Sequence, residues 1–150
     1  MSRWITRAPL SLDTLLAETS GVDAGALVVF GGVVRRDDDD VQVAGLDYDV
    51  HTTMAEKAVR EIEEEILERE GVLACRIVHR TGYVPAGEPS VLVVVRGRHR
   101  PEAFQAARDG IDMVKARAPI WKEDVTEDGE RRHHSPEEGT PLRPTDGEDR

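Results

Sequence analysis

The chain has 150 residues, and its thirty acidic and twenty basic residues give a formal net charge of −10. This length predicts one domain, and the acidic balance argues against a general nucleic-acid binder, which needs a basic face. No apolar run resembles a signal peptide or is long enough to span a bilayer, so we expect a cytoplasmic protein. The acid-rich, lysine-poor composition also indicates adaptation to high salt.

The first fifty residues predict alternating short elements. Ser11 is a plausible N-cap for a brief helix that ends before Gly21, and four consecutive aspartates belong in a solvated loop. In chain order the sequence predicts a short strand, this helix, a buried strand, the aspartate loop and a further strand, over residues 4–8, 12–18, 25–34, 35–40 and 41–50.

The clearest predicted helix begins at an N-cap, Thr52 or Thr53, and runs to about Glu70, where Gly71 stops it. Apolar residues recur every four positions and predict its buried stripe: Met54, Ala58, Ile62 and Ile66, with Val59 and Leu67 beside them. The glutamates that fill the remaining positions predict a solvated face: Glu61, Glu63, Glu64, Glu65 and Glu68.

Two strands, over residues 72–80 and 90–97, flank a predicted turn at 84–89, and Cys75 lies in the first strand as a small core residue. Pro101 suits the first turn of a helix, which ends near Arg117 because Pro119 disfavours helix at the preceding residue. Its predicted apolar stripe is Phe104, Ala107, Ile111 and Val114. Adjacent strands with packed helices predict an α+β fold with a mixed or largely antiparallel sheet. Residues 135–150 predict an acidic, proline-rich, disordered tail after a single domain over 1–134.

Only three of the twenty basic residues are lysines, and two of them, Lys115 and Lys122, bracket one short segment. Lysine can lose its proton near neutral pH when its surroundings favour the neutral form, which arginine cannot do. The third, Lys57, lies among glutamates and is interpreted as an ion-pair partner. The two retained lysines therefore predict chemistry at an amine.

Further basic residues follow or end the predicted elements, where binding sites are commonly built on a rigid frame. These are Arg35, His99 and Arg100, in addition to Lys115 and Lys122. Together they predict a pocket for a phosphate or carboxylate, in which neighbouring cations would make a lysine a usable base or nucleophile. The alternative is that they are scattered surface cations paired with the abundant acids. Histidine spacing predicts no metal site.

Several segments together resemble the large, catalytic subunit of molybdopterin synthase over about residues 4–130. They are Phe30 to Arg35, Leu46-Asp47-Tyr48 before Met54-Ala55, His79 to Gly82 followed by Gly87-Glu88, His99-Arg100 followed by Ala103-Phe104, and Lys115 to Lys122 with its Pro-Ile-Trp-Lys stretch. Each segment alone is a weak signal, and their order and spacing make the set specific.

The resemblance implies an α/β hammerhead fold and a sulfurtransferase that converts cyclic pyranopterin monophosphate into molybdopterin. Sulfur comes from the thiocarboxylated Gly-Gly terminus of a small ubiquitin-like partner, two of which bind a homodimer of large subunits to form a heterotetramer. No metal, nucleotide or other cofactor is implied. By position, Lys115 and Lys122 are catalytic, and the substrate-binding set is Val33, Val34, Arg35, His99, Arg100, Lys115, Lys122, Glu123 and Asp124.

The sequence departs from the family pattern at three places: Asp124 replaces a usual glutamate, His51 a common aromatic residue and Arg132 a usual tryptophan. The family can lend a basic residue from this region to the other protomer's site, and here Arg131 and Arg132 are the candidates. The alternative function is a non-catalytic module that holds an acidic carboxyl-terminal tail or a phosphorylated ligand in the same basic pocket.

Overall fold

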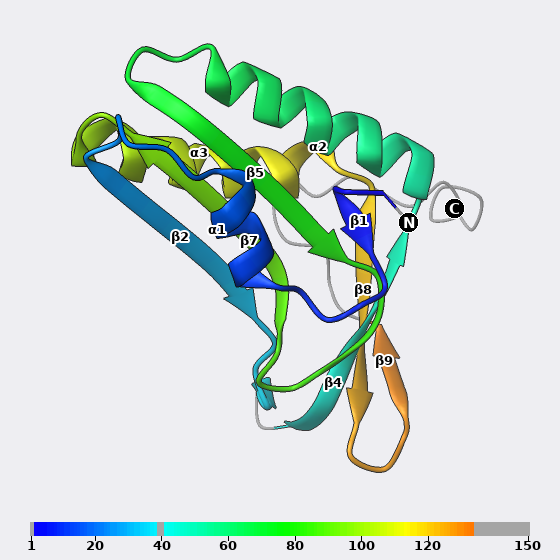
Figure 1. Cartoon of the computed structure of the whole chain (residues 1–150). Coiled ribbons are helices and arrows are strands. Elements are labelled where there is room, and N and C mark those ends of the chain that lie inside the picture. Colours follow the sequence, from blue (N-terminus) through cyan, green and yellow to red (C-terminus); the bar gives the residue numbers. More distant parts are fainter. Residues whose placement is uncertain (1, 39–40, 134–150) are drawn as a thin grey trace.

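The computed structural model describes residues 2–38 and 41–133, which form two sheets and three helices (Figure 1). The first sheet has the strand order β1 (Ile5–Thr6), β5 (Val72–Arg80), β7 (Pro89–Gly97) and β2 (Ala26–Val33). The second has the order β3 (Asp37–Asp38), β4 (Val41–Val50), β8 (Ile120–Thr126) and β9 (Arg131–His133), and β6 (Gly82–Pro85) also pairs with β4. The predicted α+β class is confirmed.

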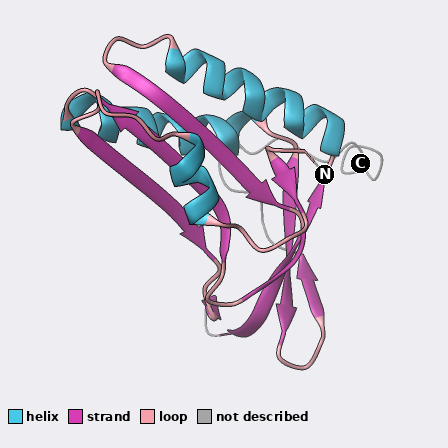
Figure 2. Cartoon of the chain, in the orientation of Figure 1, coloured by secondary structure: helices cyan, strands magenta, loops and turns pink. Residues whose placement is uncertain are grey.

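Helices cover both faces of the first sheet (Figure 2). Helices α2 (Thr52–Leu67) and α3 (Arg100–Arg117) pack on one face, and α1 (Leu12–Glu18) packs on the other. Strand β7 alternates between these layers, because Val93 lies in the large core with α2 and α3 and Val94 lies in the smaller core under α1. The sheet is therefore buried on both faces along its centre.

The register of α2 differs from the prediction at its start. His51, and neither threonine, is the N-cap, and its Nδ1 accepts a hydrogen bond from the Met54 amide at 3.4 Å. Met54 and Leu67 are exposed, and the buried stripe begins at Ala55. The predicted burial of Val59, Ile62 and Ile66 is confirmed.

The prediction that the glutamate run is solvated is wrong for Glu63, which is buried. Its Oε1 accepts hydrogen bonds from the Arg76 guanidinium and, at 2.7 Å, from the Ile77 amide, and its Oε2 accepts one from the Trp4 indole at 2.9 Å. Arg76, also buried, donates to Glu18 at 2.7 Å and to the Arg3 carbonyl at 2.7 Å. This network ties α2, β5, α1 and the amino-terminal segment together.

Predicted helix ends are largely confirmed. Helix α2 ends at Leu67, three residues before the predicted end near Glu70. Gly71 follows in the loop with φ of 82°, a left-handed conformation that glycine adopts without the steric cost of a Cβ. Pro101 lies in the first turn of α3, which ends at Arg117. Phe104, predicted to be buried, is 62% exposed, because small residues line the face of α3 that meets the sheet: Ala103, Ala106, Ala107 and Gly110.

Short strands in the second sheet were not predicted. Strand β6 includes the first two residues of the predicted turn over 84–89, β3 forms within the aspartate loop, and β9 returns along β8 after Gly129, whose φ is 83°. The predicted tail over 135–150 lies outside the described residues. Within residues 2–38 and 41–133, no helix has the length and apolar content that crossing a membrane requires.

Cys75 is 4% exposed and belongs to the main core, as predicted. Burial raises the pKa of its thiol to about 12, with the Glu63 carboxylate adding to the effect. The thiol stays protonated at neutral pH. Cys75 therefore does not supply a thiolate nucleophile.

Candidate active site at the junction of the two sheets

The last turn of α3 and the first half of β8 bring Lys115 and Lys122 towards the same buried side chain. That side chain is His79, at the end of β5. The pKa of His79 is lowered to about 4, chiefly by burial and also by the positive charges of Lys115 and Lys122, while the hydrogen bond to Arg80 opposes these effects. The two lysines that the sequence singled out thus lie close enough to act on one imidazole.

The imidazole is fixed by two contacts. Its Nδ1 lies 2.7 Å from the backbone oxygen of Arg80, and since a carbonyl oxygen can only accept, Nδ1 carries the proton of the neutral ring. Tyr48 packs edge-on against it, with ring centroids 5.0 Å apart and an interplanar angle of 71°. Tyr48 is in turn the direct cross-strand neighbour of Lys122, so these two side chains share one face of the second sheet.

The Tyr48 hydroxyl connects this face to β2. It donates to Ser90 Oγ at 3.1 Å, and Ser90 Oγ donates to the Gly32 backbone oxygen at 3.3 Å. Val34 is buried against Tyr48 in the small core between the sheets. The segment that carries Val33, Val34 and Arg35 is therefore held at the same junction, with the Val33 and Arg35 side chains exposed.

Residues of β8 alternate between its two faces, which separates two predicted neighbours. Asp124 lies two positions from Lys122 on the same face, is 1% exposed, and lies 3.4 Å from Arg132 Nη2. Glu123 faces the other way, opposite Asp47, and Arg131 pairs with both carboxylates. Arg131 and Arg132 thus each pair with acids of their own chain.

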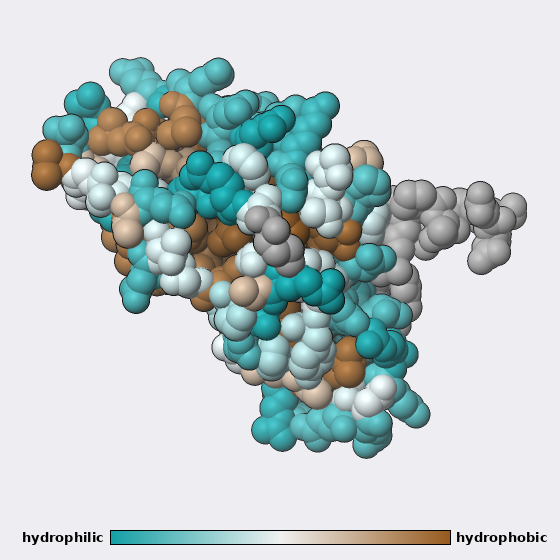
Figure 3. Space-filling model, turned by 45° about the vertical axis from the view of Figure 1, so that its right-hand side comes forward, coloured by the Kyte–Doolittle hydropathy of each residue, from teal (hydrophilic) through white to brown (hydrophobic). Residues whose placement is uncertain are grey.

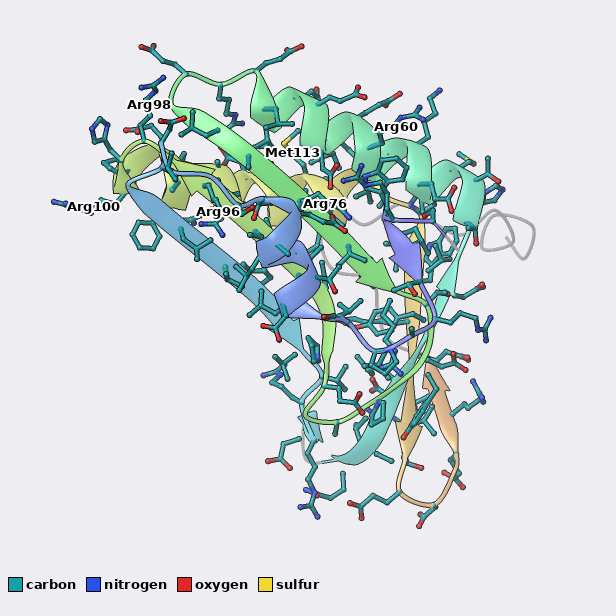
Figure 4. All side chains as sticks on the ribbon, viewed as in Figure 1. Arg60, Arg76, Arg96, Arg98, Arg100 and Met113 are labelled. Atoms are coloured by element: carbon teal, nitrogen blue, oxygen red, sulfur yellow. The ribbon has the colours of Figure 1, made fainter. Side chains whose placement is uncertain are left out.

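His99 and Arg100 lie at the opposite end of α3 from Lys115. Figure 4 shows Arg100 at the start of this helix. Arg100 and Lys115 are separated by fifteen helical residues, which places them about 22 Å apart along the helix axis. The His99 side chain is 78% exposed and lies 3.6 Å from Glu102 within a capping box. One chain therefore does not bring all five predicted basic residues into one pocket.

A cleft of about 480 Å³ opens beside the junction, between β1, β4, β8 and the segment after β5. Its lining mixes acids with a base: Asp47, Asp49, Glu123 and Arg7. Tyr48 also lines the cleft, whereas Lys115 and Lys122 do not, so the cleft adjoins the lysine site at Tyr48. Among the described residues, no three His, Cys, Asp or Glu side chains gather as metal ligands would.

Sequence reasoning did not select Tyr48 or His79 as site residues, although both lie in segments that carried the family resemblance. The available signal was a polar ring at the end of a strongly apolar strand, next to an arginine. Such a ring is ordinarily a structural core residue. The position of His79 near two lysines depends on contacts between β4, β5 and α3, which are elements far apart in the sequence.

The two lysines, and the buried neutral imidazole on which their charges act, lie on an α+β frame. The family model described as MoaE protein matches residues 5–117, and the chain belongs to this family. A curated relative from Thermoplasma volcanium, named molybdopterin synthase catalytic subunit, is 38% identical over 130 residues, covering 87% of this chain and 95% of the relative.

Solved structures agree. The crystal structure of molybdopterin synthase from Staphylococcus aureus superimposes with a TM-score of 0.80 at 34% identity, covering 89% of this chain and 99% of that one. A complex of subunits 1 and 2 of molybdopterin-converting factor from Helicobacter pylori contains a chain with a TM-score of 0.74 at 28% identity, covering 93% of each. The predicted family is confirmed.

Proposed function

We propose that this chain is the catalytic subunit of a molybdopterin synthase, which adds two sulfurs to cyclic pyranopterin monophosphate. The observation that carries the proposal is the approach of Lys115 and Lys122 to one buried imidazole at the junction of the sheets. Relatives named molybdopterin synthase catalytic subunit support it. The sulfur donor is a small partner with a thiocarboxylated carboxyl terminus, in line with the two-subunit complex from Helicobacter pylori.

The chemistry fits two ammonium groups. Both the substrate phosphate and the thiocarboxylate are anions, which lysines bind. Each transfer replaces a carbon–oxygen bond of the pterin side chain by a carbon–sulfur bond, and the oxygen leaves as the ring-opened phosphate ester or as water. Water then hydrolyses the acyl–sulfur bond to leave the partner with a carboxylate. These steps require proton transfers, for which a lysine is a suitable acid and base. We assign this role to Lys115 and the binding of the anion to Lys122.

Reconstitution tests this function. The full chain is incubated with thiocarboxylated partner and cyclic pyranopterin monophosphate, and dithiolene product is measured. We expect product to form only when all three components are present. Binding of the partner tail without any product would instead support the alternative, a non-catalytic module that holds an acidic tail.

His99 and Arg100 fit the same site if a second copy of the chain supplies them, since they lie about 22 Å from Lys115 within one chain. The surface near them suits such a contact. Phe104, one turn from Arg100, is exposed, as are Leu27, Val29 and Phe30 on β2, and apolar surface interrupts the hydrophilic exterior in Figure 3. The predicted homodimer would cover this apolar surface and bring the two ends of α3 from different chains together.

Mixed dimers test this arrangement. Chains with Lys115→Ala and chains with Arg100→Ala, each inactive as a homodimer, are tagged differently, co-expressed and purified together. If the two residues act across the dimer, each mixed dimer has one intact site, and random pairing gives about a quarter of the wild-type activity by two-fold symmetry. If they act within one chain, every site is defective, and the verified mixed dimers stay as inactive as their parents.

Three sequence-based expectations accompany this proposal and stay predictions: a cytoplasmic location, adaptation to high salt, and a disordered tail over 135–150. Val33, Val34, Arg35, Glu123 and Asp124 are proposed as residues flanking the bound tail and substrate. The buried carboxylate of Asp124, on the face of Lys122, supports its part in this set. Glu123 would act from the opposite face of β8.

A further inference from the structure

Two ring side chains, Tyr48 and His79, are buried at the base of the lysine site, at 8% and 6% exposure. We propose that they are positioning residues that hold Lys122 and Lys115 in place for catalysis. The effect of this role on turnover rests on the proposed function, but its effect on the positions of the two lysines does not. Both rings belong to strands far apart in the sequence, β4 and β5, and they meet only in the folded chain.

Several contacts fix the two rings. His79 is held by the Arg80 carbonyl on one side and by the edge of Tyr48 on the other. Tyr48 is held by Ser90 through its hydroxyl, while its backbone oxygen accepts from Thr81 Oγ1 at 3.2 Å. Because both rings are restrained in this way, they limit the movement of side chains that pack against them.

Each of the two rings has a lysine nearby. Tyr48 and Lys122 are directly paired across β4 and β8, the closest side-chain relation in an antiparallel sheet. Lys115 approaches from α3, and its charge acts on His79 together with that of Lys122. Both lysine charges that act on the imidazole are positive, and nearby positive charges favour the neutral form of the ring.

Hydrogen bonds also link Tyr48 to the segment at the end of β2. The chain of hydrogen bonds from Tyr48 through Ser90 to the Gly32 carbonyl fixes the backbone just before Val33 and Val34. The same phenol that adjoins Lys122 therefore also anchors a segment proposed to flank the substrate. Removing one hydroxyl should loosen both sides of the site together.

The kinetic test uses His79→Leu, His79→Gln and Tyr48→Phe in the reconstituted enzyme. We expect His79→Leu to lower kcat roughly 10- to 100-fold, the size of effect that misplacing a reacting group by about 1 Å produces. His79→Gln, whose amide can still donate to the Arg80 carbonyl, should recover most of this loss. Tyr48→Phe, at the direct neighbour of Lys122, should raise KM more than it lowers kcat, because Lys122 is assigned to anion binding. The matched control is Tyr83→Phe, at an exposed position whose cross-strand partner is Asp47, on the opposite face of β4 from Tyr48.

A second measurement is independent of activity. Because the chain has only three lysines, carbon-13 labelling of the lysine side chains gives three sets of NMR signals, which single Lys→Arg variants assign. We expect His79→Leu and Tyr48→Phe to shift the signals of Lys115 and Lys122 and to leave Lys57 unchanged. Lys57 is the internal reference, since its side chain is on the exposed face of α2 and pairs with Glu61.

The two measurements separate the outcomes. Folded variants that keep wild-type kcat, wild-type KM and wild-type Lys115 and Lys122 signals would overturn the positioning role. If a variant does not fold, Tyr48→Phe, which removes a single atom, still decides the question. Wild-type enzyme that makes no product would count against the proposed function alone, because the lysine signals report on positioning without turnover.

Discussion

Replacing Lys115 with alanine is expected to abolish molybdopterin formation in the reconstituted assay and to leave the protein folded. The side chain lies in the last turn of α3 and is exposed, so its removal opens no cavity in the core. Loss of a positioned acid–base group lowers the rate by about 10²- to 10⁴-fold. Product formation is measured by single-turnover kinetics, and folding is checked by thermal denaturation.

Two further variants sharpen the result. Lys115→Arg keeps the positive charge but cannot release a proton near neutral pH, so it should remain inactive while still binding substrate. Lys122→Ala should raise KM more than it lowers kcat, because Lys122 is assigned to anion binding. The control is Lys57→Ala, an exposed pair with Glu61 at 4.0 Å, which should turn over normally. Retained turnover in Lys115→Ala would remove the role given to this residue.

Replacing Glu63 with alanine is expected to lower the free energy of unfolding by about 3–5 kcal/mol, the usual cost of removing one partner from a buried ion pair. Arg76, at 5% exposure, would keep only Glu18 as a carboxylate partner, and Glu18 lies at the surface end of the network. The Ile77 amide and the Trp4 indole would also lose their acceptor. Urea denaturation followed by tryptophan fluorescence measures the change.

The neighbouring residue supplies the matched control. Glu64 is on the same helix but exposed, and Glu64→Ala should change the free energy of unfolding by less than about 0.5 kcal/mol. Glu63→Gln should fall between the two, because an amide oxygen still accepts from Ile77 but carries no charge for Arg76. Equal stability of Glu63→Ala and Glu64→Ala would show that the network does not stabilise the fold.

Local signals predicted the secondary structure well where they were strong. Ser11 caps α1 over the predicted span, and Pro101 and Pro119 bound α3 as expected, because caps and prolines act on their own backbone. Burial was less predictable, since it depends on which element packs where. Phe104 fits an apolar stripe but overhangs the sheet, and Glu63 breaks the stripe of α2 yet is buried because Arg76 faces it from β5.

The residues of the candidate site were also predictable only in part. Scarcity of lysine pointed to Lys115 and Lys122, and the structure brings them together because a short turn at Pro119 joins α3 to β8. Within one chain the predicted pocket does not include His99 and Arg100, because α3 has 18 residues and holds them at its opposite end from Lys115. Tyr48 and His79 were missed since their relation to the lysines arises only from strand pairing and packing.

The length of α3 has a consequence for how the sequence can change. A helix keeps both the distance and the angular relation of the residues at its ends, so inserting one residue between Arg100 and Lys115 would turn everything beyond it by about 100°. Lys115 would then swing away from His79, whereas exchanging surface side chains along the helix would leave it in place. Variation in working relatives should therefore take the form of substitutions within α3, with insertions and deletions confined to the loops at its ends.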